Sequence, residues 1–240
     1  YAIAVTPTAL YVTCNGDVYF LDNEEWFRAS DEFIKALTKE LDNIECVDPA
    51  KLGLLEWNHE EEDDFNAAHV ALCVLDRRLV NIAGEKGGIE FCDLLADNSG
   101  RIQLIHVKSE SGAALRALFA QGFVSAQLYN LDAEFQSKVH AGDLQKAKGG
   151  SVSATAKKQL AALAGRHLRE ITIVFAIHDE TPSHAVPAGA TVTSEVLKGT
   201  LSTFAKADLL NRATDLRAMG YEVAVCRIRP YPTPKRPKKK

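Results

Sequence analysis

The segment that most restricts the fold is EITIVFAIH at residues 170 to 178, which is apolar over most of its length. A strand with one buried face alternates apolar and polar residues, whereas a strand covered on both faces is a nearly continuous apolar run. The segment is therefore typical of a central parallel strand. Because such a strand needs helices on both faces of its sheet, we expect an α/β fold.

Helices and strands are predicted around this segment in an order that suits such a sheet. Acidic residues open HEEEDDFNAAHVALCVL, which predicts a helix from about 60 to 75. The later predicted elements are a three-stranded meander at 79–83, 89–95 and 102–108, helices from Gly112, at 133–141 and at 156–164, the strand at 170–178, a helix near 203–219 and a strand at 221–228. This order predicts an α/β/α sandwich with a mixed central sheet.

The first part of the chain is predicted to form a smaller unit. Two β-type runs at 9–13 and 17–20 flank an Asn-Gly turn, and Ser30 precedes an amphipathic helix from about Asp31 to Leu41. The predicted organisation is an accessory lobe at 1–55, the main domain at 56–228 and a basic proline- and lysine-rich tail at 229–240. Since the chain starts at Tyr1 and its one methionine is Met219, we expect the lobe to continue from an upstream segment.

Composition and charge narrow the class of protein. The chain is 46% hydrophobic and 25% charged, and no run approaches the roughly 20 apolar residues of a membrane-spanning helix. Its five cysteines lack CxxC spacing, which indicates reduced thiols in a cytoplasmic protein. The net charge is −4, yet Glu60 to Asp64 are all acidic and the tail is basic. The tail is either a phosphate-binding arm or a disordered solubilising extension.

Residues suited to phosphodiester chemistry lie on the predicted meander. Asp93 is near the end of the second strand and Lys108 at the end of the third, so a hairpin turn at 97–100 brings the two strand ends together. By alternation His106 shares a face with Lys108. Asp93 could bind a metal ion, Lys108 could stabilise charge or orient water, and His106 could be a ligand or general base. The alternative is an ordinary turn aspartate, a strand-end lysine and a half-buried histidine.

The predicted strand order, together with the spacing D-x(12)-H-x-K from Asp93 to Lys108, resembles the PD-(D/E)XK restriction-endonuclease-like superfamily. This resemblance implies that Glu60, Glu61 or Glu62 supplies a helix carboxylate, with Glu62 as our choice, and that Mg²⁺ or Mn²⁺ is the cofactor. It also implies that Gln121, on the helix after the lysine strand, touches the site. The alternative for Gln121 is a solvated helix face.

A closer resemblance is carried by IEFCDLL, LIHVK, LRALFAQGFVSAQL and MGYEVAVCRI. These segments are similar to a sporadically distributed bacterial family that is assigned to the restriction-endonuclease-like class and is otherwise of unknown function. That resemblance implies a role in defence against foreign DNA. The sequence departs from the superfamily pattern at His106, where an acid is expected. Imidazole is a better ligand for Mn²⁺ than for Mg²⁺. At this point the sequence is consistent both with an active nuclease and with a binding domain derived from one.

The sequence thus predicts a metal-dependent nuclease that hydrolyses DNA, with RNA as a further substrate class, and no membrane partner. The resemblance also implies that the protein forms a homodimer. Arg77 and Arg78, before the first meander strand, could contact phosphate or form an exposed basic turn. The competing function is a catalytically inactive module of the nuclease fold that binds nucleic acid or a protein.

Overall fold

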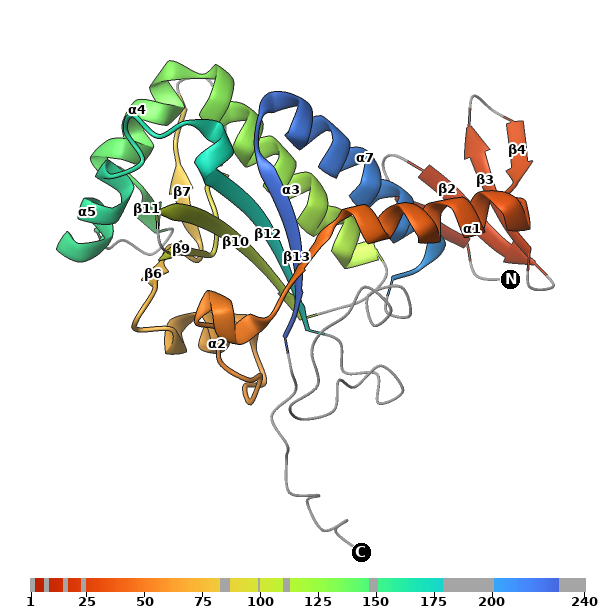
Figure 1. Cartoon of the computed structure of the whole chain (residues 1–240), viewed down its shortest axis with the longest axis horizontal. Coiled ribbons are helices and arrows are strands. Elements are labelled where there is room, and N and C mark those ends of the chain that lie inside the picture. Colours follow the sequence, from red (N-terminus) through yellow and green to blue (C-terminus); the bar gives the residue numbers. More distant parts are fainter. Residues whose placement is uncertain are drawn as a thin grey trace, which may run out of the picture.

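The computed structural model describes residues 3–6, 9–14, 17–22, 25–82, 87–98, 100–109, 113–146, 151–178 and 201–228. Its centre is a six-stranded mixed sheet (Figure 1). The strand order is β5 (Glu45–Val47), β13 (Glu222–Arg227), β12 (Ile171–His178), β10 (Arg101–Ser109), β9 (Leu94–Asn98) and β6 (Cys73–Val74). β5, β13, β12 and β10 run parallel, and β9 and β6 complete the sheet with antiparallel pairing.

The predicted central strand is confirmed as β12. It pairs in parallel with β10 along its whole length, from Ile171 opposite Ile102 to His178 opposite Ser109, and with β13 on its other side. Every residue of β12 is buried, as a strand covered on both faces requires. The prediction of an α/β sandwich with a mixed sheet is also confirmed.

Two long helices cover one face of the sheet, α3 (Ala113–Leu131) and α7 (Thr203–Met219), which run side by side in Figure 1. Leu118 of α3 and Leu209 of α7 belong to the same buried cluster as Leu104 and Ile173 of the strands. α7 ends at Met219, and the Gly220 that caps it has a φ of 104°, in the left-handed region that glycine adopts readily. α4 (Ala133–Ala141) and α5 (Ala154–Ala161) extend this cluster beyond the sheet.

The other face has a thinner cover. The short helix η2 (Pro49–Leu52), Trp57 and α2 (Glu62–Ala68) pack on it. Their buried residues form a second cluster with the opposite side chains of the same strands, among them Ile105 and Val107 of β10. The two clusters show that β10 alternates strictly between faces, because Ile102 and Leu104 belong to the first and Ile105 and Val107 to the second.

The predicted three-stranded meander is wrong. β7 (Arg78–Val80) and β8 (Ile89–Glu90) pair with each other and with β11 (Gln145–Lys146) in a separate small sheet. Residues 94 and 95, the end of the strand predicted at 89–95, instead begin β9, which continues to Asn98 into the predicted turn and pairs with β10 in the central sheet. The chain therefore changes sheets between Glu90 and Leu94, because its two halves find different partners.

The helix predicted at 60–75 is also wrong in its second half. α2 ends at Ala68, and Cys73 and Val74 form β6, which pairs with Leu95 and Leu94 of β9. The apolar residues of this segment thus complete the edge of the sheet instead of a helical face. The predicted basic tail at 229–240 lies outside the described residues.

The first part of the chain forms the predicted hairpin within a larger antiparallel sheet of β1 (Ile3–Thr6), β2 (Ala9–Cys14), β3 (Asp17–Asp22) and β4 (Glu25–Arg28). α1 (Asp31–Glu40) follows, and Ser30 Oγ accepts the Phe33 N–H at 3.2 Å as its cap. After η1 (Leu41–Asn43), β5 joins the central sheet beside β13. Residues 45–47, within the range predicted as the accessory lobe, are thus part of the main sheet. Among the described residues no helix has the length and apolarity to cross a membrane.

Candidate functional site

Asp93 lies where the chain passes from the small sheet to the central one, not within a strand as predicted. Its backbone N–H donates to Ile105 C=O at 3.1 Å, and its side-chain Oδ2 accepts the Val107 N–H at 2.7 Å. The backbone of Leu75 also donates to Asp93 C=O at 2.7 Å. The residue is 4% exposed. Asp93 is thus fixed against β10 by its backbone and its carboxylate together.

Three carboxyl groups meet at this break in the strand. Asp76, Glu90 and Asp93 each offer an oxygen, and these oxygens all lie within 4.8 Å of one another. In an unbroken strand Glu90 and Asp93 would point to opposite faces, because they differ by three positions. The change of sheet between them removes that constraint. Asp76 comes from the turn after β6 and is held by Asn66 of α2, whose Nδ2 donates to Asp76 Oδ1 at 2.8 Å.

Glu90 is oriented by two donors. The backbone N–H of Arg77 donates to its Oε1, and Gln121 Nε2 of α3 donates to its Oε2 at 2.9 Å. Arg77 has a φ of 55°, and this left-handed conformation accompanies the contact of its N–H with the carboxylate. Gln121, predicted to touch the site, is thus linked to the acidic cluster.

Lys108 and Glu62 form a pair beside the three carboxyl groups. Lys108 Nζ lies 3.3 Å from Glu62 Oε2, which also accepts the Ser109 N–H at 3.2 Å. Glu62 is the first residue of α2, so the helix places this carboxylate at the end of β10. Glu62 lies outside the group of mutually close ligand oxygens, although it was predicted to bind metal. Its charge nevertheless contributes to raising the pKa of both Glu90 and Asp93.

Two carboxyl groups of the cluster, those of Glu90 and Asp93, resist ionisation because their pKa is raised. Burial is the main cause that raises the pKa of Glu90 from 4.5 to about 7, with the charges of Asp76 and Glu62 adding to it and the Arg77 and Gln121 hydrogen bonds opposing it. Burial likewise raises the pKa of Asp93 well above its usual value, followed by the charge of Glu90, while the Val107 hydrogen bond lowers it. Crowded acids of this kind are stabilised in their charged form by a cation.

The donor set fits a hard divalent cation. Mg²⁺, Mn²⁺ and Ca²⁺ prefer carboxylate and carbonyl oxygens, and the cluster has no cysteine or histidine in it. Asp93 has Oδ1 available beside the Oδ2 that accepts from Val107. Asp76, Glu90 and Asp93 would hold the ion. Lys108 would be linked to the site through Glu62, whose charge acts on both Glu90 and Asp93.

The structure does not bring His106 to this cluster. Its ring is 0% exposed, neither ring nitrogen has a hydrogen-bond partner, and it packs 6.2 Å from the Phe175 ring. A Cβ at Gly122 of α3 would come within 3.2 Å of His106 Cδ2, so the helix closes over this face. Burial lowers the pKa of His106 to about 4. The predicted role of His106 as ligand or general base therefore has no contact to support it.

The two arginines predicted to bind nucleic acid have different surroundings. The guanidinium of Arg77 pairs with Asp63 of α2, and its side chain is largely exposed. Arg78 belongs to β7, where it pairs with Lys146 of β11 and is half-buried. Arg77 therefore contacts the acidic cluster through its backbone N–H on Glu90, while its guanidinium pairs with Asp63 outside the cluster.

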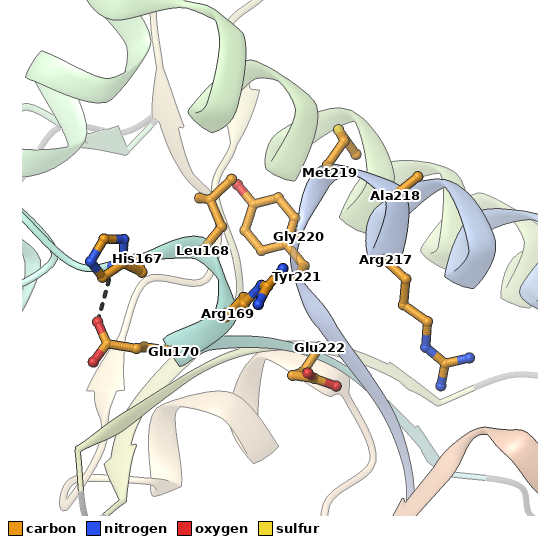
Figure 2. Close-up of a pocket in the computed structure, with 10 residues that line it drawn as sticks. All are labelled: His167, Leu168, Arg169, Glu170, Arg217, Ala218, Met219, Gly220, Tyr221 and Glu222. Carbon is orange, nitrogen blue, oxygen red and sulfur yellow. Dashed lines mark hydrogen bonds between the residues drawn. The ribbon is translucent and has the colours of Figure 1, made fainter.

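A cavity of about 960 Å³ lies elsewhere, lined by residues 167–170 and 217–222 (Figure 2). It includes η3 (Leu168–Glu170), where Glu170 accepts the His167 N–H at 2.9 Å. This cavity is at the start of β12, whereas His178 at the end of β12 hydrogen-bonds Ser109 beside Lys108. The cavity and the carboxyl cluster thus lie at opposite ends of the sheet, and the chemistry of the cluster does not involve the cavity.

Sequence reasoning missed Asp76, Asn66 and the participation of Glu90. The three-residue spacing allows Glu90 to join Asp93 only if a bulge or break lies between them, and the structure shows that the chain changes sheets there. For Asn66 no signal in the sequence was available, because its contact with Asp76 depends on where α2 packs. Asp76 was missed although it lies directly before Arg77 and Arg78, because that turn was considered only for its basic residues.

Comparison of the chain with curated proteins and with solved structures finds no match. Residues 8–229 match a family of unknown function, so the chain belongs to that family, DUF6119.

Proposed function

We propose that this protein is a metal-dependent nuclease that hydrolyses phosphodiester bonds, with DNA as the first substrate to test. The observation that carries the proposal is the meeting of Asp76, Glu90 and Asp93 within 4.8 Å, with the Lys108–Glu62 pair beside them. Three acids around one point suit a divalent cation, and a lysine that pairs with Glu62, whose charge acts on two of those acids, suits a substrate that carries negative charge.

The roles of the residues follow from their contacts. A bound divalent cation would supply Lewis-acid polarisation of a phosphate oxygen and lower the pKa of a water molecule. Lys108 would stabilise the negative charge that develops on phosphorus, because its ammonium group is held at the end of β10. Gln121 and the Arg77 N–H would keep Glu90 oriented, and Val107 would keep Asp93 oriented.

The test is cleavage of plasmid DNA and single-stranded RNA by purified protein with Mg²⁺ or Mn²⁺ and with EDTA. Wild-type protein is compared with Lys108→Ala and with Lys158→Ala, which changes an exposed lysine of α5. We expect cleavage that requires metal, falls at least a hundredfold in Lys108→Ala and is unchanged in Lys158→Ala. Equal cleavage by wild type and Lys108→Ala would contradict the assigned role of the lysine.

A second function has one observation in its favour. The ammonium group of Lys108 is already paired with Glu62, and His106 supplies no second acid. A module of this kind could bind nucleic acid or a protein without cutting. It would show no cleavage with any metal, while Lys108→Ala would weaken nucleic-acid binding in a salt-dependent manner.

The setting that we propose is the cytoplasm of a prokaryote, in defence against foreign DNA, with the chain acting as a homodimer. The support for defence and for dimerisation is the resemblance to restriction-endonuclease-like proteins. The support for the cytoplasm is that the five cysteines, all within the described residues, form no disulfide bond, with Cys73, Cys92 and Cys226 buried.

A further inference from the structure

Asn66 is a buried side-chain amide whose oxygen accepts no hydrogen bond. The residue is 0% exposed and lies on the face of α2 that packs on the sheet. Its Nδ2 donates to Asp76 Oδ1 at 2.8 Å, whereas its Oδ1 is buried without a hydrogen-bond partner. Buried amide oxygens are normally paired, because an unpaired one loses its hydration without compensation. This oxygen belongs to the same side chain that contacts the carboxyl cluster.

We infer that Asn66 is a further ligand of the divalent cation, and that its amide turns so that Oδ1 replaces Nδ2 beside Asp76 when the cation is bound. The inference rests on the cation site of the proposed function and goes beyond it by adding a neutral oxygen ligand from α2. The cation class is a hard divalent ion, Mg²⁺ or Mn²⁺, because all the ligands are then oxygens.

The distances agree with such a ligand set. Two adjacent oxygens bound to one Mg²⁺ at about 2.1 Å, at right angles, are about 3 Å apart. The present separation between Asn66 Nδ2 and Asp76 Oδ1 is 2.8 Å, so a turn of the amide about its last bond places Oδ1 at nearly that separation. The carboxylate oxygens lie within 4.8 Å of one another, which is about twice a cation–oxygen distance.

An amide suits both states of the site. Without a cation, Nδ2 donates a hydrogen bond to Asp76, which a carboxylate or an apolar side chain cannot do. With a cation, Oδ1 can coordinate it without adding another negative charge to the buried acids Glu90 and Asp93. The ligands would then come from α2, the turn after β6, β8 and the break before β9. A cation would therefore link four separate segments of the fold.

The experiment measures thermal unfolding and Mn²⁺ affinity of the full chain, in EDTA and in MnCl₂, for wild type, Asn66→Asp and Asn66→Leu. Asn211→Asp, at an exposed asparagine of α7, is the matched control. We expect Asn66→Asp to melt below wild type in EDTA, because it adds an acid next to Asp76, and to show a larger rise of Tm with Mn²⁺. We expect Asn66→Leu to bind Mn²⁺ at least tenfold more weakly than wild type.

Wild-type Mn²⁺ affinity in Asn66→Leu, or a rise of Tm in Asn66→Asp no larger than in wild type, would overturn the inference. If Asn66→Leu does not fold, the Asn66→Asp comparison decides the question alone. Lys108→Ala separates this inference from the proposed function, because it should lose cleavage and keep the rise of Tm with Mn²⁺. Absence of cleavage by wild type, with the Asn66-dependent rise intact, contradicts the nuclease and supports the ligand role of Asn66.

Discussion

The carboxylate of Asp93 accepts the backbone N–H of Val107 at 2.7 Å, in the place where a continuing strand would have offered a backbone carbonyl. The side chain thereby ends the pairing of β9 with β10 and stays fixed at the end of β9 nearest Lys108. Because only Oδ2 makes this contact, Oδ1 is left for a cation. The same geometry that interrupts the strand therefore creates the position of the site.

The raised pKa of Glu90 predicts that the metal-free protein loses stability as the pH rises toward neutrality. Its pKa is 4.5 ordinarily and about 7 in the folded protein, so between these values the folded state binds more protons than the unfolded state. The free energy of unfolding should fall by roughly 3 kcal/mol across this interval and level off above it. Denaturation with urea in EDTA from pH 4.5 to 8 measures the fall.

Glu90→Gln is the variant that isolates this effect, since glutamine does not ionise and its one side-chain oxygen can still accept the Arg77 N–H, while its amide nitrogen can donate to the Gln121 side-chain oxygen once that amide turns. The free energy of unfolding of Glu90→Gln should fall less with rising pH than that of wild type, and the difference should equal most of the contribution of Glu90. Glu60→Gln, at an exposed position before α2, serves as the control and should keep the wild-type profile. Parallel profiles for wild type and Glu90→Gln would show that the carboxyl of Glu90 is not held in its protonated form.

Burial of His106 makes the stability of the protein depend on pH in the opposite direction. Its pKa falls from 6.5 to about 4 on burial, so between these values the unfolded state binds more protons and stability rises with pH. We expect His106→Leu to remove this rise, which amounts to roughly 3 kcal/mol. At pH 7 the variant should be more stable than wild type by about 1 kcal/mol, because leucine replaces a ring with two unpaired nitrogens.

Chemical denaturation at pH 4.5 and pH 7 tests this prediction, and Mn²⁺ affinity measured on the same variant tests the placement of the ring outside the site. Unchanged Mn²⁺ affinity is expected. A tenfold loss would return His106 to the cluster as a ligand.

Gly122 is required by the packing of α3 on the sheet. A Cβ there would come within 2.6 Å of Phe175 Cε1 and 3.2 Å of His106 Cδ2. Gly122→Ala should therefore destabilise the protein by about 1–3 kcal/mol despite the better helix propensity of alanine. Gln127→Ala, on the exposed side of the same helix, is the control. In a double-mutant cycle with Phe175→Leu the cost of Gly122→Ala should shrink, and an unchanged cost would place the clash elsewhere.

The central strand and the helices after it were predictable because local patterns and burial agree there. β12 is apolar throughout, and α7 carries its stop signal at Gly220. The end of α2 was not predictable. Cys73 and Val74 continue an apolar run, yet they pair with Leu95 and Leu94 of a strand twenty residues later, and no helical periodicity reveals that competition.

The candidate site was predictable in part. Alternation predicts that His106 and Lys108 share a face of β10, but it could not show that α3 covers His106 whereas Lys108 pairs with Glu62 of α2. His106 is fully buried beneath Gly122, whereas the side chain of Lys108 remains 30% exposed. In one continuous strand from 89 to 95, alternation would keep Glu90 on the face opposite to Asp93, and the change of sheets between them could not be read from the sequence.

The most direct test of the central claim is a Mn²⁺ titration followed by electron paramagnetic resonance, with wild-type protein and Asp93→Asn side by side at pH 8. Asparagine keeps an oxygen that can accept from Val107, so the fold should survive while the charge at the site falls. We predict that wild type removes free Mn²⁺ from solution with saturable binding, and that Asp93→Asn binds it at least tenfold more weakly. Equal Mn²⁺ binding by the two proteins, or none by either, would contradict a cation site formed by Asp76, Glu90 and Asp93.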